Sequence, residues 1–596
     1  MGHRQYRGDS SDETQKTTFL DSQLIKRLFQ YLRPYRFLLI SGILILIVAK
    51  ALEAYIPIYI GNVTQQILVI PDDLSPILRQ CLQIMGLLFV VYLLDGINVL
   101  LKSWVGHKAL FKLRTDVYRQ IQSMPVSYYD TRSVGKMMTR TIHDVDQINQ
   151  MFAESIIPLI GSIVLFISVY IGIFFVDWRL GLVMTAVLPM VFWLTNHFRI
   201  HQRRCYDHIR TVVATMNAFV QEHLMGASTI RSFGLQEQEK ARFEKINQDH
   251  RNAYLETIHY FAFFFAGIDF VQSISLIAVF VVLVSFPTGE MGFQAGTFFT
   301  FSLYALMLFR PLSDLADRYN VLQSAVSAAS RIFHLLDQEP EKNIAGADKK
   351  LDEIHSIEFD DVWFAYKDEE WILKGLSFQI AKGESLALVG VTGAGKTTVM
   401  NLLLRYYDYQ KGIIRINGVD IHKYPIHEIR KHFSMVLQDP EIFSGTIAEN
   451  IGLYQPGITE GKIETVVDYV NLRSLVQRYP DGIQHLISER GKSLSAGERQ
   501  LLSMARAVAH HRSVLMLDEA TANIDTGTER MIQEALHKIL KDKTAVVIAH
   551  RLSTIQDVSR ILVLHNGVVS ETGTHQELLR KKGIYEKLYR LQFLNG

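Results

Sequence analysis

The sequence predicts an all-α membrane domain of six spanning helices, followed by a soluble α/β domain. Three observations support this fold class. The chain has 596 residues, too many for a single hydrophobic core. Long apolar stretches with few charges are concentrated before residue 320. From residue 357 onward, short β-rich segments alternate with helical patterns, as is typical of a sheet flanked by helices.

The overall composition averages over these two unlike halves, with 48% hydrophobic and 20% charged residues. The net charge of +2 is almost balanced, so we expect no nucleic-acid partner. Cys81 and Cys205 are too few for a disulfide framework and are interpreted as free thiols. Residues 1–18 are polar and lack the apolar segment of a signal peptide, which predicts a disordered cytosolic tail.

Six segments have the roughly 20 mostly apolar residues that cross about 30 Å of hydrocarbon. They are residues 37–61, 84–105, 156–176, 180–198, 261–284 and 295–315. Only Asp177, Trp178 and Arg179 separate the third from the fourth, which predicts a tight hairpin. The sixth is the weakest match, because Arg310, Pro311 and other residues interrupt it.

Lys and Arg collect before the first segment, between the second and third, and between the fourth and fifth. The positive-inside rule then predicts a multi-pass membrane protein with its N-terminus and soluble domain in the cytosol. The two long loops on that side have few Gly or Pro residues. We therefore expect the spanning helices to continue well beyond the bilayer rather than to end in mobile loops.

Charged and aromatic residues inside the spans leave two interpretations open. Lys50 and Glu53 can neutralise each other on one helix face, whereas Asp95 and Asp269 have no partner nearby in the sequence. These aspartates face either a watery substrate path or a neighbouring helix. The aromatic residues of the fifth and sixth spans line an apolar cavity, or else face lipid and other helices: Phe263, Phe264, Phe265, Phe270, Phe298, Phe299 and Tyr304.

The segment Gly390-Val-Thr-Gly-Ala-Gly-Lys396-Thr397-Thr398 follows an apolar strand and precedes a helix-compatible run. This context predicts a phosphate-binding loop, in which glycine lets backbone N–H groups curl around phosphates at a helix N-terminus. Lys396 then contacts the β- and γ-phosphates, and the Thr397 hydroxyl ligates Mg²⁺. The loop residues expected at the nucleotide are Gly390, Thr392, Gly393, Ala394, Gly395, Lys396, Thr397 and Thr398.

A second apolar strand, residues 514–517, is followed directly by Asp518 and Glu519. An acid at the end of such a strand can hold Mg²⁺ through its water shell, and a second can polarise the attacking water. Between the two strands lies Ser493-Leu-Ser495-Ala-Gly497-Glu-Arg-Gln500, which opens an amphipathic helix.

The order of these motifs resembles the ATP-binding cassette proteins: phosphate loop, Gln438, a Leu-Ser-x-Gly signature, strand-Asp-Glu, then His550. Together with the six spans, the resemblance covers nearly the whole chain and is closest to bacterial multidrug-resistance-like exporter half-transporters of the Mdl type. It implies residues 19–327 as the transmembrane domain, 328–354 as a linker, and 355–596 as the ATPase domain.

The resemblance also implies roles for single residues. Glu519 is similar to the catalytic base, His550 to the switch histidine at the γ-phosphate, and Tyr366 to the aromatic residue that stacks on adenine. Gln438 resembles the residue that senses the γ-phosphate and Mg²⁺. The implied metal ligands are Thr397, Gln438 and Asp518, and the implied cofactors are ATP and Mg²⁺. Asp525 resembles the aspartate of the loop that crosses to the partner.

In this family the residues that match Ser495 and Gly497 contact ATP held by the opposite subunit, so the resemblance implies a dimer. Two positions depart from the usual signature: Ala496 stands where glycine is usual, and Glu498 where glutamine is usual. A larger side chain and an added negative charge would weaken phosphate binding there. Because Glu519 is intact, the sequence favours a heterodimer with a second half-transporter, and a homodimer that tolerates the variant is the alternative.

The resemblance implies ATP-driven export of hydrophobic or amphipathic small molecules across the inner (cytoplasmic) membrane by alternating access. The implied partners besides the second subunit are the lipid bilayer and the hydrophobic small-molecule substrate. A lipid translocase and a siderophore importer on the same fold are the alternatives.

Overall fold

The computed structural model describes residues 22–69, 75–285, 295–341, 348–518, 525–541, 543–548, 555–556 and 558–591. The predicted tail 1–18 lies outside these ranges. By their contacts, the described residues form two compact units. One comprises residues up to Ser123 together with Arg132–Gln338, and the other comprises Met124–Thr131 together with residues from Glu339 onward.

In the residues that the structure describes, the secondary structure of the first unit is helical, as expected. Its principal helices are α1 (Ser22–Leu32), α2 (Arg36–Val69), α3 (Ser75–Gln122), α7 (Ile157–Val176), α8 (Trp178–Met225), α10 (Gln236–Ser285) and α11 (Ala295–Leu336). Shorter segments complete it: η2 (Arg33–Tyr35), α5 (Val134–Thr139), η3 (Arg140–Asp144), α6 (Val145–Gln150), η4 (Met151–Ile156) and α9 (Ala227–Ser232).

Five helices of the described chain are long and apolar enough to cross a membrane. They contain the first five predicted spans, while the sixth lies in α11, whose described apolar stretch is Ala295–Leu308. The hairpin between α7 and α8 is confirmed, since Asp177 caps α8 by accepting a hydrogen bond from the Arg179 N–H at 2.8 Å.

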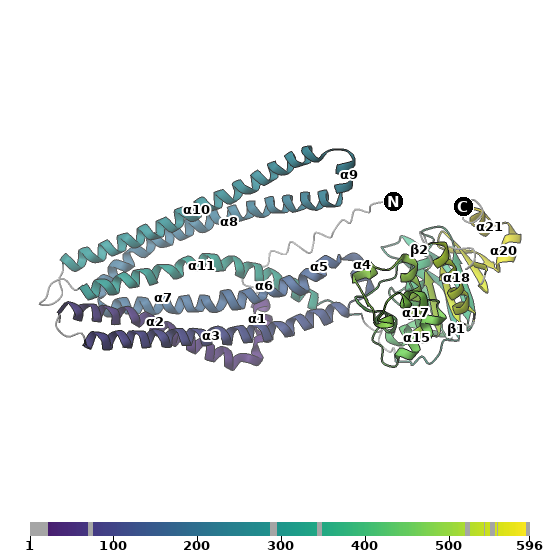
Figure 1. Cartoon of the computed structure of the whole chain (residues 1–596), viewed down its shortest axis with the longest axis horizontal. Helices are drawn as coiled ribbons and strands as arrows, with labels where there is room; N and C mark the ends of the chain where they lie inside the picture. The colour runs from purple at the N-terminus through teal and green to yellow at the C-terminus, as the bar shows by residue number, and fades with distance from the viewer. Residues whose placement is uncertain are drawn as a thin grey trace. The chain divides into compact units, whose positions relative to one another are not determined.

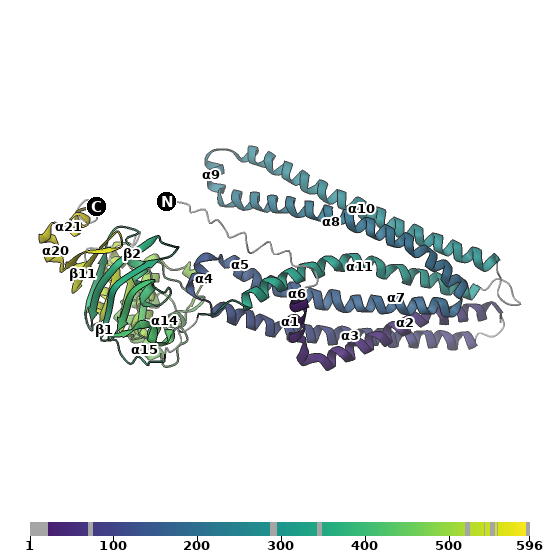
Figure 2. The same ribbon diagram turned by 180° about the vertical axis from the view of Figure 1, so that it is seen from behind.

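The expectation that spans continue as long helices is also confirmed. Helices α8 and α10 have 48 and 50 residues, more than twice the length that a bilayer requires. They run side by side and are joined at one end by α9 (Figures 1 and 2). None of the residues of α9 is buried, and Leu224, Met225 and Phe233 beside it are exposed.

The second unit is an α/β fold with α4 (Val126–Thr131) attached to it. A four-stranded antiparallel sheet has the order β2-β1-β4-β5, and a six-stranded sheet has the order β12-β11-β3-β10-β9-β6 among the described residues. Strands β11, β3, β10, β9 and β6 run parallel to one another, and β7 pairs with β8.

The strands are β1 (Ser356–Ala365), β2 (Trp371–Ala381), β3 (Ser385–Val389), β4 (Lys411–Ile416), β5 (Val419–Asp420), β6 (Phe433–Val436), β7 (Gly445–Thr446), β8 (Leu486–Ile487), β9 (Val514–Asp518), β10 (Thr544–Ile548), β11 (Arg560–His565) and β12 (Val568–Gly573). The helices are α12 (Lys396–Leu403), α13 (Ile426–Arg430), α14 (Ile447–Gly452), α15 (Glu460–Tyr469), α16 (Arg473–Gln477), α17 (Ala496–Ala509), α18 (Thr526–Leu540), α20 (His575–Lys581) and α21 (Ile584–Tyr589), with 3₁₀ turns η5 (Ile421–Lys423), η6 (Gly482–Gln484) and η7 (Glu489–Gly491).

The parallel strands are apolar on both faces, because each face is covered. Along β9, Leu515 and Leu517 belong to the core shared with α17 and α18. Their neighbours Val514 and Met516 belong to the opposite core, which is shared with α12 and the antiparallel sheet. Alternating side chains of one strand thus fill two cores, which holds the carboxyl ends of the strands rigidly at one edge.

Candidate nucleotide site

The phosphate-binding loop lies where β3 ends and α12 begins, as its sequence context predicts. Gly393 and Gly395 adopt positive φ values of 86° and 99°, which side chains other than glycine rarely adopt. Gly395 is also the residue that caps α12. A Cβ atom at Gly390 would lie 2.3 Å from the Leu564 carbonyl oxygen, so the loop packs directly against β11.

Lys396 is buried at the start of α12, with 8% of its surface exposed. Its ammonium group donates hydrogen bonds to the carbonyl oxygens of Gly390 and Val391, at 2.7 and 3.1 Å. Burial lowers the pKa of Lys396, while the nearby Asp518 carboxylate acts to raise it. The ammonium group is therefore held against the backbone carbonyls of the phosphate-binding loop.

Asp518 ends β9, which pairs with β10 on one side and β6 on the other. Gln438 follows β6 by two residues and is exposed. Because the carboxyl ends of parallel strands meet at one edge, the phosphate loop, Asp518 and the Gln438 segment all lie at the same edge of the sheet. Strands β9 and β6 are neighbours there, whereas β10 lies between β9 and β3. Thr397 is exposed, whereas Thr398 is buried. Hydroxyl, carboxylate and amide oxygens are hard ligands that fit Mg²⁺.

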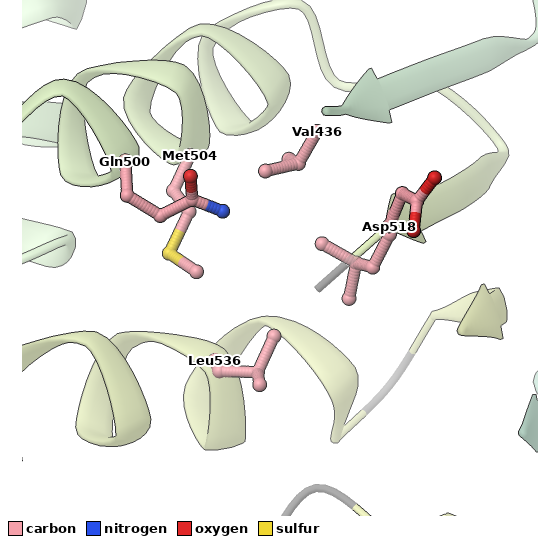
Figure 3. A pocket seen from close by; sticks show the side chains of 6 residues that line it. Val436, Gln500, Met504, Asp518 and Leu536 are labelled. Carbon is pink, nitrogen blue, oxygen red and sulfur yellow. The ribbon is translucent and has the colours of Figure 1, made fainter. Parts of the chain in front are cut away.

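A cavity of about 10 Å³ lies beneath this edge, lined by Val436, Gln500, Met504, Leu517, Asp518 and Leu536. In Figure 3 the Asp518 carboxylate points away from the other labelled side chains. The space is at most water-sized, so it is a packing feature between β9, α17 and α18 rather than a nucleotide pocket.

Tyr366, the predicted adenine-stacking residue, follows β1 and is 45% exposed. Its ring meets those of Phe364 and Tyr407 edge to face, with ring centroids 4.8 and 4.9 Å apart. Its hydroxyl accepts a hydrogen bond from Asn401 at 3.2 Å and lies 3.3 Å from the Thr398 Oγ1 atom. The ring orientation is thus fixed from the phosphate-loop helix, and ring surface remains exposed for a base to stack on.

The predicted signature opens α17 through a capping box. The Ser495 Oγ atom accepts from the Glu498 N–H at 3.2 Å, and the Glu498 carboxylate accepts from the Ser495 N–H at 2.8 Å. Gly497 is buried, whereas Ser495 and Ala496 are exposed. In the described residues, neither Ser495 nor Gly497 shares a hydrogen bond with the phosphate loop of its own chain.

Of three other predicted residues, only Asp525 is among those that the structure describes. Asp525 caps α18 by accepting from the Thr528 N–H at 2.9 Å, and this bond lowers the pKa of its carboxyl. Glu519 and His550 lie outside the described residues.

Two side-chain contacts beside the site were not predicted from the sequence. Arg478 lies 2.5 Å from the Glu498 carboxylate, and the Tyr407 hydroxyl donates to Asp130 of α4. The capping pattern Ser-x-x-Glu could have shown where the Glu498 side chain turns. No local signal identifies Arg478 or Asp130, because both contacts depend on the fold.

In the membrane unit, Lys50 contacts Glu53 at 2.7 Å, as expected, and also Asp95 of the next helix at 3.2 Å. Asp95 therefore bonds to a neighbouring helix, which is one of the two interpretations given above. Asp269 is exposed. Of the aromatic set, Phe264 and Tyr304 are buried in the helical core. Phe263 and Phe270 are instead 63% and 62% exposed, at an open apolar hollow of about 320 Å³ between α8 and α10. Its other lining residues are Met190, Trp193, Leu194, Ala266, Gly267 and Val271.

Comparisons with known proteins agree with both units. Residues 39–312 match the family model described as ABC transporter transmembrane region, and residues 373–522 match the model described as ABC transporter.

Similar proteins include a probable multidrug resistance ABC transporter ATP-binding/permease protein, YheH, of Bacillus subtilis (strain 168). It is 35% identical over 88% of this chain and 78% of its own length. An ATP-dependent lipid A-core flippase of Vibrio vulnificus (strain YJ016) is 32% identical over 98% of this chain and all of its own length.

Among solved structures, that of a bacterial Atm1-family ABC exporter with ATP bound is similar over 94% of this chain and 98% of its own, with 25% sequence identity and a TM-score of 0.74. The chain thus belongs to the ATP-binding cassette transporters, as an exporter half-transporter that fuses one membrane-spanning region to one ATPase domain.

Proposed function

We propose that this multi-pass ATPase exports hydrophobic or amphipathic compounds of the multidrug type across the cytoplasmic membrane by alternating access. ATP-driven export follows from the family. The observation that best supports the choice of substrate is the open hollow of about 320 Å³ between α8 and α10, whose lining side chains are apolar. The naming of one relative as a multidrug resistance transporter agrees with it. The proposed orientation keeps the N-terminus and the ATPase domain in the cytosol.

We assign each candidate residue a role in ATP hydrolysis. Tyr366 stacks on adenine, and the residues from Gly390 to Thr398 surround the phosphates with Lys396 as their cation. Thr397, Asp518 and Gln438 hold Mg²⁺, Glu519 is the general base, and His550 contacts the γ-phosphate. The common position of the loop, Asp518 and the Gln438 segment at the carboxyl edge of one sheet supports this assignment.

A half-transporter works as a dimer, and we propose that Ser495 and Gly497 bind the γ-phosphate of ATP on the other subunit, with Asp525 in the loop that crosses over. The N-terminus of α17 favours such an anion. The altered signature supports a heterodimer. A homodimer is the second candidate, because Ala496 is exposed and the charge of Glu498 is offset by Arg478.

Glu519→Gln tests the hydrolysis assignment. The amide keeps the shape of the side chain but cannot accept a proton, so we expect ATP binding to be retained and steady-state turnover to fall by more than about 100-fold. Glu534→Gln, a surface variant on α18, is the matched control and should hydrolyse ATP normally. Near-normal turnover in Glu519→Gln would refute the assignment.

Transport direction and substrate class are measured separately. In inside-out vesicles, an exporter accumulates an amphipathic dye in the lumen when ATP is added. Stimulation of the ATPase by defined lipids but not by amphipathic drugs would identify the lipid-translocase alternative, which the flippase relative brings into consideration. Removal of the dye from the lumen on adding ATP would identify an importer.

A further inference from the structure

Glu498 places a negative charge at the helix end where the proposed function requires a phosphate to bind. Its side chain is 13% exposed, and one carboxylate oxygen is committed to the Ser495 N–H. A carboxylate repels a phosphate and competes with it for the positive end of the helix dipole. An uncompensated Glu498 would therefore weaken ATP binding at this signature.

The second carboxylate oxygen of Glu498 meets a cation. The Arg478 Nη2 atom lies 2.5 Å from it, and this hydrogen bond raises the pKa of Arg478. Arg478 is the residue that caps the carboxyl end of α16, 20 residues before Glu498 in the sequence. Each oxygen of the carboxylate thus has a donor from within its own domain.

The same arrangement determines which hydrogen-bonding group of the Ser495 side chain remains available to a ligand. Its Oγ atom already accepts from the Glu498 N–H, so its hydroxyl hydrogen is the group that remains to be donated. Donation to a phosphate oxygen requires that no other strong acceptor attracts that hydrogen. Pairing with Arg478 places a cation on the second carboxylate oxygen, and so offsets the negative charge that Glu498 presents beside the hydroxyl.

We propose that Arg478 is a positioning residue for the signature: it neutralises Glu498 and holds the capping box, so that Ser495 can bind the γ-phosphate of the opposite ATP. This inference rests on the proposed role of the signature. An exposed ion pair usually adds little to fold stability, and Arg478 is itself 55% exposed. The principal effect of losing it should therefore fall on ATP affinity rather than on folding.

The experiment uses the purified, reconstituted transporter and measures kcat and KM for ATP at low and high salt. The two ATPase domains must close over both ATP molecules before hydrolysis, so weaker binding at the site that this signature completes raises KM in a homodimer and in a heterodimer alike. Arg478→Gln leaves Glu498 uncompensated, so KM should rise about fivefold at low salt while kcat is nearly retained. High salt screens the exposed charge, so the increase in KM should shrink. Glu498→Gln keeps a cap acceptor without the charge, and in the double variant KM should return to within about twofold of wild type.

Arg473→Gln is the matched control, because Arg473 begins the short helix α16 that Arg478 caps, and it pairs with Glu464 and Asp468 of α15 rather than with Glu498. Its KM should not change. Unchanged KM in Arg478→Gln, or no rescue by Glu498→Gln, would overturn the proposal. If Arg478→Gln and Glu498→Gln lower the melting temperature equally without a change in KM, the proposal is also overturned. That result would mean that the ion pair contributes to fold stability and not to ATP binding.

Two further measurements keep the outcome decisive. If Arg478→Gln folds poorly, Arg478→Lys retains the charge, and its KM must stay within about twofold of wild type. Failure of the proposed function itself is recognised separately. In that case the unmodified protein would show no ATP hydrolysis that is lost in Glu519→Gln.

Discussion

Gly395 satisfies two separate constraints at the entrance to α12. Its φ of 99° lies in the left-handed region, and a Cβ atom there would come within 2.6 Å of the Leu373 Cδ2 atom. The first constraint concerns the backbone and the second concerns space. Both are determined by the fold around the loop, since Leu373 belongs to β2 of the antiparallel sheet.

We therefore expect Gly395→Ala to destabilise the domain by about 1–3 kcal/mol and to weaken ATP binding by more than tenfold. The strain displaces the first turn of α12, which carries Lys396 and Thr397. Thermal unfolding and titration with a fluorescent ATP analogue measure the two effects. Gly418→Ala is the control, because its φ of 73° is also positive but no atom lies within 4 Å of the new Cβ. It should lose stability only, and equal binding losses in both variants would contradict the prediction.

At the residue scale, local sequence was sufficient wherever the chemistry depends on consecutive residues. The phosphate loop is such a case, because its glycines, Lys396 and the helix start are neighbours in the chain. The environment of Glu498 could not be predicted in this way. Its charge suggested a weakened signature, whereas the folded chain brings Arg478 against it from another helix.

Helix α4 packs with a part of the chain that is distant from it in the sequence. It lies in the loop after the second predicted span, yet by its contacts it belongs to the ATPase unit. The Tyr407 hydroxyl donates to Asp130 of α4, and the Tyr407 ring packs edge to face on Tyr366. Burial, together with the Asp130 carboxylate, raises the pKa of Tyr407, so the hydroxyl remains a donor at neutral pH.

Tyr407→Phe should preserve ATP affinity, because the ring and its contact with Tyr366 remain. It should lower transport per ATP hydrolysed by about threefold or more, since a hydrogen bond to a charged group is worth about 1.5–3 kcal/mol and here joins α4 to the nucleotide site. Dye uptake and phosphate release in the same vesicles give this ratio.

Tyr409→Phe is the control for this prediction. It removes a hydroxyl 3.4 Å from the Asp420 carboxylate, a pairing that does not involve α4, and should leave the ratio unchanged. If Tyr407→Phe transports as efficiently as wild type, the contact with Asp130 does not contribute to coupling.

Helices and their connections could be predicted from the sequence where the apolar segments are long. The apolar spans and the hairpin at Asp177 follow from composition and one capping residue. The attachment of α4 to the ATPase unit was not predictable, because Asp130 and Tyr407 are 277 residues apart and only tertiary packing joins them.

At the scale of the whole molecule, the identity of the second subunit distinguishes the two dimer candidates. Purification of the tagged chain from its native membrane should yield an equimolar second half-transporter with a replaced catalytic glutamate, if the departures at Ala496 and Glu498 reflect division of labour. Mass spectrometry of the purified complex measures this. Recovery of this chain alone, as a dimer, would refute the heterodimer and agree with the pairing of Glu498 with Arg478.

The strand order of the six-stranded sheet also has a consequence for biosynthesis. Strand β3, which carries the phosphate loop, is flanked by β10 and β11, more than 150 residues later in the chain. While the ribosome is still translating the signature and β9, β3 therefore has neither neighbour, and its apolar face is uncovered. Such long-range pairing is slow and exposes the chain to aggregation. ATP can stabilise the ATPase domain only after β11 has emerged. The membrane helices are therefore inserted well before the ATPase domain can bind ATP.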